Sequence, residues 1–399
     1  MTQSTVHDDE VTVTDAATSL LDRLPLGAKI AVVVVMPLFL IATFIFSFVG
    51  AGANPTPYEM PVTLAGPGEQ TEQLADQIAD ETDEDAFSFT FTTKADAAKE
   101  DVESRESVGA IVIGEQDVTV YTASAAGAGQ AALVKQVGAE VAQQLEMPMT
   151  STDVAAPVEH DAGGMSVFFF LIVCTLATFL TVVILALMLP TARLGAQLGA
   201  TAVASILGPI IGFFIISTFV GDFGVTFGSI TAVLGVGMLY AFTVGVLTLT
   251  FARLAGLGGV LIGMILLIAA SFPSSGGATS AALLPPFWQG VHDVWIGSAA
   301  LEWTRGIVYF DGAQVEAWAG QLLTWTAVGI ILLTAVSAWQ WFRTTRKNTV
   351  SNAGPGEQST ALSEEIKLTQ VHVSRRDRRP AISSTPRGNE IAEEPAPTG

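Results

Sequence analysis

One stretch near the carboxyl end combines aromatic, charged and proline residues in a pattern that could support binding. Residues 282–312 read ALLPPFWQGVHDVWIGSAALEWTRGIVYFDG. Glu302 and Arg305 are three residues apart, so on a helix they lie on one face and can form an ion pair. That pairing lowers the free-energy cost of placing both charges near lipid. The other candidate residues of this stretch are Trp288, Asp293, Trp295, Trp303 and Tyr309.

The stretch is too interrupted to cross a bilayer and too apolar for an ordinary water-facing loop. Pro285 and Pro286 are tolerated in a first helical turn, which predicts a short helix over about 286–293. We expect a break near Gly297 and a second helix over about 298–309. Together they form a re-entrant outer hairpin at about 282–310. Two roles stay open for it, an outer gate that contacts lipid and an interfacial lid with an internal ion pair.

Catalytic and metal-binding patterns are not evident elsewhere. The four histidines are scattered, no Ser–His–Asp or paired-carboxylate arrangement appears, and no phosphate-binding loop is present. The single cysteine, Cys174, lies in an apolar run and is expected to be buried. GLGG at 256–259 also lies in an apolar run, where close helix packing explains it better than a dinucleotide site. We therefore expect no enzyme, no metal and no cofactor.

The composition indicates a membrane protein. Half of the residues are hydrophobic and 14% are charged, against about 25% charged in typical soluble domains. A membrane-spanning helix needs about 20 mostly apolar residues. Six stretches meet that requirement: 29–51, 166–189, 198–220, about 226–251, about 255–272 and 320–341.

Basic residues set the expected orientation, because Lys and Arg are enriched in cytoplasmic loops. Arg23 and Lys29 precede the first span, Arg193 and Arg253 lie in short turns, and Arg343 follows the last span. All fall on one side if both termini are cytoplasmic. The middles of the six spans hold no Asp, Glu, Lys, Arg or His, which argues against proton-driven transport. If the protein transports, its energy would come from another subunit.

The segment between the first two spans has the features of a folded outer domain. Between residues 51 and 165 there are 21 acidic and four basic residues, which disfavours binding to nucleic acid. MPVTLAG, FSFTFTT, VGAIVIG and DVTVYTAS predict strands. GEQTEQLADQIADE, DAAKEDVESRE and AALVKQVGAEVAQQLE predict amphipathic helices. The run DETDED is expected to be a solvated turn, with a divalent-cation site as the alternative.

These observations predict an α-helical polytopic membrane protein with six transmembrane helices and a small extracytoplasmic α/β domain inserted between helices one and two. The expected parts are a cytoplasmic N-terminal tail (1–28), the first span (29–51), the acidic outer domain (52–165), a five-helix membrane domain (166–341) and a disordered cytoplasmic tail (342–399). SRRDRRP at 374–380 could contact anionic lipid or remain solvated. The expected location is the plasma membrane.

Four segments resemble a known family. They are PTPYEMPVTLAG at 55–66, ESVGAIVIG followed by VTVYTASAAGAGQA, VEHDAGGMSVFFF at 158–170, and the segment from FPSSGGATSAALLPPFWQGV to ALEWTRGIVYFDG at 272–312. Their order and spacing resemble the permeases of type-2 ABC exporters, within them the actinobacterial YhgE/Pip (phage infection protein)-like branch. The resemblance covers roughly residues 25–340.

The resemblance implies a membrane subunit of an ABC-type exporter that moves a lipophilic or cell-envelope substrate. It implies a separate ABC ATPase subunit and a homo- or hetero-dimer of permeases in contact with membrane lipid. In that scheme the turn PTARLGAQLG is the coupling element, with Arg193 and Gln197 as its candidate residues. The alternative is a non-transporting membrane scaffold or envelope receptor whose outer domain binds a partner or a surface polymer.

Overall fold

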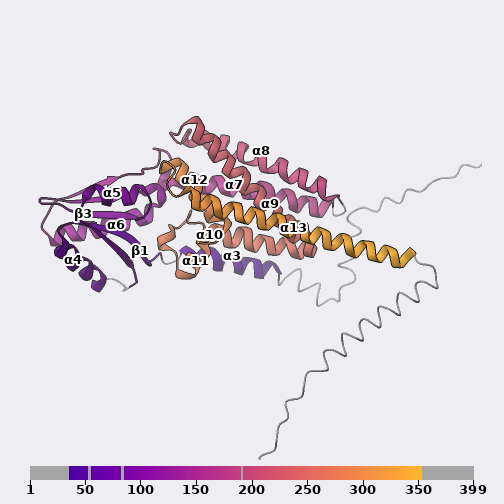
Figure 1. Cartoon of the computed structure of the whole chain (residues 1–399), viewed down its shortest axis with the longest axis horizontal. Coiled ribbons are helices and arrows are strands. Elements are labelled where there is room, and N and C mark those ends of the chain that lie inside the picture. Colours follow the sequence, from indigo (N-terminus) through magenta and orange to yellow (C-terminus); the bar gives the residue numbers. More distant parts are fainter. Residues whose placement is uncertain (1–35, 53–54, 82–84, 190–191, 353–399) are drawn as a thin grey trace, which may run out of the picture. The chain divides into compact units, whose positions relative to one another are not determined.

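The computed structural model of the chain describes residues 36–52, 55–81, 85–189 and 192–352. The predicted tail 1–28, the part of the predicted tail 342–399 that follows residue 352, and the middle of DETDED lie outside these residues. Residues 342–352, which we expect to be disordered, instead continue the last helix. Figure 1 shows a sheet with its covering helices and a separate set of long helices. The five strands are β1 (Met60–Ala65), β2 (Phe87–Thr92), β3 (Gly109–Ile113), β4 (Val118–Thr122) and β5 (Met149–Asp153). The helices of the sheet domain are α4 (Gly68–Glu81), α5 (Ala95–Glu103) and α6 (Ala128–Gln144).

The strands form one mixed sheet in the order β2-β1-β3-β4-β5. β1 pairs in parallel with both β2 and β3, β3 pairs antiparallel with β4, and β4 pairs in parallel with β5. The four predicted strands and three predicted helices are confirmed. β5 is a further strand, in a segment for which the sequence predicts no strand. Its side chains are mostly exposed, so its sequence lacks the alternation of apolar and polar residues that predicts a half-buried strand.

Each face of this sheet has its own hydrophobic core. β3 is buried throughout and sends alternate side chains to the two faces. One core contains apolar residues of β1, β3 and β4 together with α4 and α6, and the other contains residues of β1 and β3 together with α5. The sheet domain is therefore a three-layer α/β arrangement.

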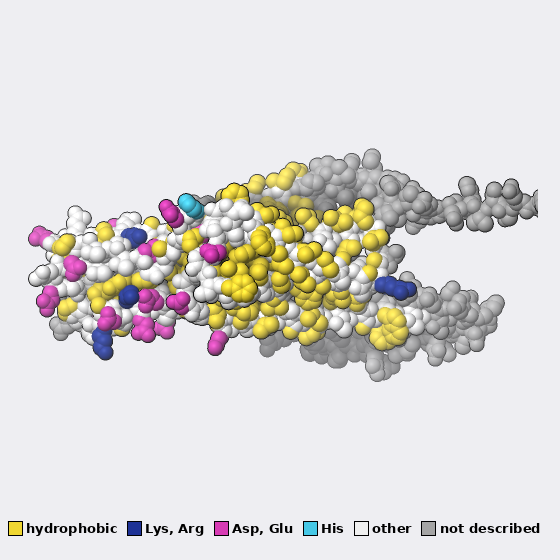
Figure 2. Space-filling view, turned by 90° about the horizontal axis from the view of Figure 1, so that it is seen from above, with side chains coloured by type: hydrophobic (Ala, Val, Ile, Leu, Met, Phe, Trp, Pro, Cys, Tyr) yellow, Lys and Arg dark blue, Asp and Glu magenta, His cyan; other side chains and the backbone are white. Residues whose placement is uncertain are grey.

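Four helices are long and apolar enough to cross a membrane: α7 (Met165–Met188), α8 (Leu194–Val220), the first part of α9 (Phe227–Gly256) and α13 over Val315–Arg343. Two shorter apolar helices cover Leu38–Gly52, within α3 (Met36–Gly52), and Gly258–Ser274. The membrane character is thus confirmed. In Figure 2, hydrophobic side chains cover the helices and charged side chains gather over the sheet domain.

The apolar segment after residue 227 is divided by a sharp turn. Helix α9 (Phe227–Met264) contains non-helical backbone at Ala255 and Gly256. Gly256 has φ 57° and ψ −132°, a conformation that favours glycine. A Cβ at Gly259 would lie 1.7 Å from the Phe251 carbonyl oxygen, so the chain folds closely back on itself. The GLGG motif therefore makes a turn with close packing, and a π-helical stretch, η4 (Ile265–Ala270), follows.

Small residues bring α7 and α8 together. A Cβ added at Gly208 would lie 2.5 Å from the Ala177 Cβ, and one at Gly212 would lie 2.9 Å from Val173 Cγ1. The small-xxx-small pair Gly208/Gly212 is therefore a packing contact. Nothing lies within 4 Å of the same position at Gly195 or at Gly199, so that pair is not packed within the described chain.

The carboxyl-terminal helix α13 (Val315–Asn352) extends past the predicted end of the last span. By internal contacts the chain divides after Ser337, and the second unit begins at Ala338. Within that unit the guanidinium carbon of Arg343 lies 3.7 Å from the centre of the Trp339 ring. This is a cation–π contact of the kind found where aromatic and basic residues gather at a membrane surface.

Candidate functional site

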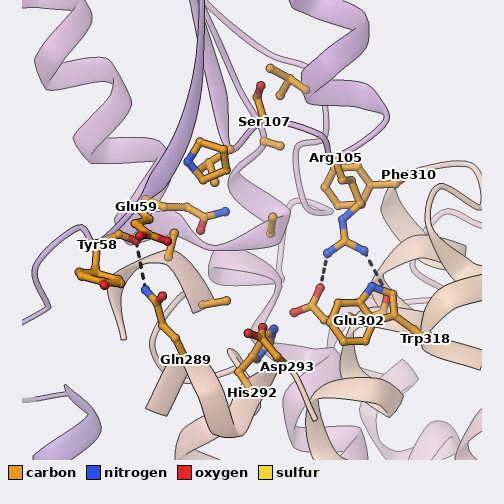
Figure 3. A pocket seen from close by; sticks show the side chains of 18 residues that line it. Tyr58, Glu59, Arg105, Ser107, Gln289, His292, Asp293, Glu302, Phe310 and Trp318 are labelled. Carbon is orange, nitrogen blue, oxygen red and sulfur yellow. Dashed lines mark hydrogen bonds and ion pairs between the residues drawn. The ribbon is translucent and has the colours of Figure 1, made fainter. Parts of the chain in front are cut away.

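The predicted outer hairpin meets the sheet domain at a buried ion cluster. Arg305 Nη1 donates to Glu302 Oε1 at 2.8 Å, as the spacing of these residues predicts. Arg105, in the turn between α5 and β3, donates from Nη2 to the other carboxylate oxygen of Glu302 and from Nη1 to its carbonyl oxygen at 3.2 Å. Figure 3 shows Arg105 reaching Glu302 from the sheet domain. We call Arg105, Glu302 and Arg305 the ion cluster.

Burial and charge act in opposite directions on Glu302. Glu302 is 3% exposed and Arg305 is 1% exposed. Burial would raise the pKa of the Glu302 carboxyl, but the charges of Arg305 and Arg105 outweigh it and hold the pKa below its usual value. Glu302 is therefore a carboxylate that the two arginines keep ionised inside the protein.

Arg105 is held in place by three further features. Its backbone adopts φ 66°, a left-handed conformation that is uncommon for a residue with a side chain. Gln314 Nε2 donates to its carbonyl oxygen at 2.8 Å. Its guanidinium carbon lies 4.8 Å from the centre of the Phe310 ring. The sheet domain thus presents this arginine to the hairpin in a defined geometry.

A second polar contact joins the hairpin to the start of α7. Tyr309 Oη donates to Asp161 Oδ2 at 2.6 Å, and the other oxygen of Asp161 accepts the backbone N–H of Ser166 at 2.9 Å. Asp161 is 2% exposed. Burial and the neighbouring Asp161 carboxylate raise the pKa of the Tyr309 phenol, which keeps it a donor. Asp161 therefore links the first turn of α7 to the hairpin.

Residues flanking the hairpin complete both cores of the sheet domain. Leu283, in the short 3-10 helix η5 (Ala281–Leu283), belongs to the core formed with α4 and α6. Phe310, just after α12, belongs to the opposite core formed with α5. Both are 6% exposed. The sheet domain is thus completed on both faces by a segment far away in the sequence.

The hairpin consists of α11 (Pro286–His292) and α12 (Ile296–Tyr309). The predicted break near Gly297 is wrong, because the break lies between Asp293 and Trp295 and Gly297 is inside α12. A Cβ at Gly297 would lie 2.3 Å from Ser271 Oγ. This glycine therefore permits the close approach of α12 to α10 (Ser271–Ser274) and does not interrupt the helix.

The three candidate tryptophans have packing roles in different surroundings. Trp288 is buried in a small cluster with Ala51 of α3. Trp295 is half-buried, donates from Nε1 to the Leu266 carbonyl oxygen at 3.1 Å, and its ring centre lies 5.1 Å from that of Trp325. Trp303 is half-buried against the core of the long helices. These rings pack the hairpin against the helices around it.

The two candidate residues of the coupling turn differ in their surroundings. Arg193 is exposed and immediately precedes the first turn of α8. Gln197 is 5% exposed, and its side-chain oxygen accepts hydrogen bonds from Arg253 Nε at 3.0 Å and Nη2 at 2.8 Å. Gln197 is therefore occupied in joining the start of α8 to α9, whereas the Arg193 side chain is accessible.

A cavity of about 270 Å³ lies between the sheet domain and the hairpin. Its wall includes Arg105 and Glu302 of the ion cluster, and Asp293 and His292 from the end of α11 (Figure 3). His292 is buried, and its Nδ1 lies 2.8 Å from the Ser274 carbonyl oxygen. The structure thus brings together Asp293, Glu302 and Arg305 around one region, while Tyr309 and the tryptophans lie in separate contacts.

Sequence reasoning missed Arg105, Asp161, Leu283 and Phe310 as members of this region. Arg105 did carry a signal, because it is one of only four bases in the acidic segment 51–165. Its partner Glu302 is far away along the chain, and no local periodicity indicates such a pairing. Comparison with family models, curated proteins and solved structures finds no significant match for the chain.

Proposed function

We propose that this chain is the membrane subunit of an ABC-type exporter that moves a lipophilic or cell-envelope substrate with ATP hydrolysed by a separate subunit. The observation that carries the proposal is the buried ion cluster. It joins the outer domain to the hairpin, so a displacement of the helices that hold the hairpin would also move the outer domain. Such a connection is suited to a transporter in which ATP hydrolysis on the opposite side of the membrane drives a conformational change. The resemblance in segments 55–66, 158–170 and 272–312 supports the same function.

Six membrane crossings form part of this proposal. The ion cluster puts the hairpin on the same side as the sheet domain, whereas the turn at Gly256 follows an odd number of long helices after that domain. The apolar helix Gly258–Ser274 would then cross back, despite its shorter length. The end of α3 also approaches the hairpin, because a Cβ at Gly50 would lie 3.7 Å from Trp288 Nε1. Both termini are then cytoplasmic and residues 52–165 extracytoplasmic.

The coupling turn receives separate roles for its two candidate residues. Arg193 is exposed at the turn and would contact the ATPase subunit. Gln197 would act as a positioning residue, because its hydrogen bonds to Arg253 fix the first turn of α8 against α9. A displacement of the turn would then move α8 and α9 together.

The outer faces of the long helices suit contact with lipid and with a second permease. α8 exposes large apolar side chains, among them Ile206, Ile211, Phe214 and Phe219. A homo- or hetero-dimer of permeases would cover part of this surface and lipid the rest. In this function the hairpin would form an outer gate, while a lid with an internal ion pair is the alternative role.

A second candidate function is a non-transporting scaffold or envelope receptor. The sheet favours it in one respect, because β2 and β5 are edge strands and each has a free backbone edge in the described chain. Free sheet edges can accept a strand from a partner. A surface polymer is the other class of partner for such a receptor.

The experiment that separates the two functions begins with the full-length chain purified from native membranes in a mild detergent. The exporter function expects an ABC ATPase to co-purify and its ATP turnover to fall several-fold with Arg193→Ala. Gln197→Ala should lower both turnover and the unfolding temperature, because it removes the two hydrogen bonds that join the start of α8 to α9. Asp222→Ala, at the other end of α8, is the matched control and should change neither. Recovery of envelope proteins without any ATPase would refute the exporter and support the receptor.

A further inference from the structure

The cavity between the sheet domain and the hairpin has polar walls from several elements. Tyr58 and Glu59 precede β1, Gln130 lies on α6, and His292 and Asp293 end α11. At about 270 Å³ the cavity has room for a small organic molecule. A molecule bound there would touch the outer domain and the hairpin at once.

The positive charge in the wall is already engaged. Arg105 directs Nη1 and Nη2 toward the backbone and the carboxylate of Glu302, as the dashed lines of Figure 3 show. The other carboxylate oxygen of Glu302, Oε1, accepts a hydrogen bond from Arg305 Nη1. The Arg105 guanidinium that lines the cavity is therefore already paired with Glu302.

Beyond the ion cluster, the wall offers free hydrogen-bond acceptors, together with one buried donor that has no partner in the described chain, Trp318 Nε1. The carboxylates of Glu59 and Asp293 make no hydrogen bond or ion pair with another described residue. His292 Nδ1 faces the Ser274 carbonyl oxygen, so Nδ1 carries the proton in the neutral ring. Nε2 is then left as an acceptor.

Gln130 gives independent support for a ligand. Its residue is 5% exposed, yet its side-chain amide has no partner among the described residues. Buried amides are normally hydrogen-bonded, and this one lines the cavity. A ligand with N–H donors would supply the missing partner for its oxygen.

The charge balance selects the class of ligand. Glu302 is paired with two arginines in the ion cluster, which carries one net positive charge, so the further carboxylates of Glu59 and Asp293 leave the region with one net negative charge. Excess negative charge and vacant acceptors favour a cation that carries several N–H donors. The acids do not gather as a metal site, since no group of three or more potential ligands is close enough in the described chain. The Tyr58 and Trp318 rings in the wall also suit an organic cation.

We propose that this cavity binds a small organic molecule through a primary ammonium group. The exposed carboxylates of Glu59 and Asp293 supply the opposing charge, and Gln130 or His292 accepts an N–H bond of the ammonium group. The ligand joins the outer domain to the hairpin and stabilises their contact. This proposal is independent of the exporter function, because it rests only on the cavity wall.

The test uses full-length protein in phosphatidylglycerol nanodiscs and three probes of similar size. They are 2-phenylethylamine, which is a cation at pH 7, the neutral 2-phenylethanol and the anionic phenylacetate. We expect the amine to raise the unfolding temperature and to bind at least tenfold more tightly than the alcohol in calorimetry, with no binding of the anion. Equal binding of amine and alcohol, or no binding of the amine, overturns the proposal.

Variants then assign the site. Glu59→Gln and Asp293→Asn should each weaken amine binding about three- to tenfold, and together they should abolish it, with the unfolding temperature of the free protein unchanged. Asp222→Asn is the control and should bind normally. Unchanged affinity in the double variant also overturns the proposal.

A final arm distinguishes two sources of the ammonium group. Nanodiscs that contain phosphatidylethanolamine would compete with the amine if the natural ligand is a lipid headgroup. Absence of competition would indicate a free amine. Both results support the proposed chemistry, because the arm is read only after the amine has been shown to bind.

Discussion

Glu302 is held between two arginines that come from different parts of the chain. Arg305 is one turn away on α12, and Arg105 belongs to the sheet domain. Removing three charges from water costs free energy, so such a cluster is weak evidence for net stability. Its geometry instead fixes where the hairpin meets the outer domain. Arg305 Nε has no partner in the described chain, which adds to the cost and underlines a positioning role.

Arg305→Ala should destabilise the protein much more than Asp311→Ala. Losing one partner of a buried pair costs about 3–5 kcal/mol, and Arg305 also donates to the Gly276 carbonyl oxygen at 3.0 Å. Asp311 is exposed with φ 49°, so alanine there costs only about 1–2 kcal/mol of backbone strain. Thermal unfolding in detergent measures the difference. Equal tolerance of both substitutions would count against a structural ion cluster.

The ion cluster should also give stability a specific pH dependence. The pKa of Glu302 is lower in the folded protein than its unfolded value of about 4.3. The stabilisation is therefore present above the unfolded pKa and is lost as pH falls through the folded-state pKa. Wild type should unfold at a higher temperature than Glu302→Gln at pH 7, and the gap should narrow below about pH 4. A gap that stays constant over this range would contradict the prediction.

Elements of secondary structure were largely predictable because their patterns are local. β3 is buried throughout, and the side chains of β4 alternate between buried and half-buried. Helices α7, α8 and the first part of α9 are continuous apolar runs. The Glu302–Arg305 pair was predictable for the same reason, since both residues lie on one helix. β5 was missed because its exposed polar residues carry no periodic signal.

Contacts between distant elements could not be predicted in this way. Gly297 was taken as a break because glycine is unfavourable inside a helix, but the close approach of Ser271 requires it there. Arg105 and Phe310 likewise depend on tertiary neighbours that no spacing along the chain reveals. The sequence therefore predicts only those residues of the candidate site that belong to the hairpin.

Two glycines of α8 offer a matched test of its packing. Gly208→Ala should lower the unfolding temperature, because the new Cβ would lie 2.5 Å from the Ala177 Cβ and the two helices would have to separate. Gly195→Ala meets nothing within 4 Å and should be neutral or stabilising, since alanine is favoured over glycine in helices by about 1 kcal/mol. Unfolding in detergent, followed by the loss of the monodisperse peak in gel filtration, measures both. A decrease in both variants would indicate that α8 does not tolerate alanine for another reason.

At the scale of the whole molecule, residues 282–312 connect parts that are separate in the sequence. Leu283 and Phe310 complete the two cores of the sheet domain, and Trp288 packs near the end of α3. The stretch is mixed in composition because each portion has a different neighbour: apolar residues fill cores, and the paired charges meet Arg105. This arrangement also constrains the proposed topology, in which the chain returns to the side of the sheet domain after the turn at Gly256.

That constraint leads to a labelling prediction on intact cells. The native Cys174 is buried and should not react, so single cysteines can be introduced at the exposed positions Glu115, Asp222 and Arg193. With the sheet domain outside, Glu115→Cys and Asp222→Cys should react with a membrane-impermeant maleimide, whereas Arg193→Cys should react only after permeabilisation. Arg343→Cys, after the last span, should behave like Arg193→Cys because six crossings return the chain to the cytoplasm. Reaction of Arg343→Cys in intact cells would mean that the shorter apolar helix Gly258–Ser274 does not cross.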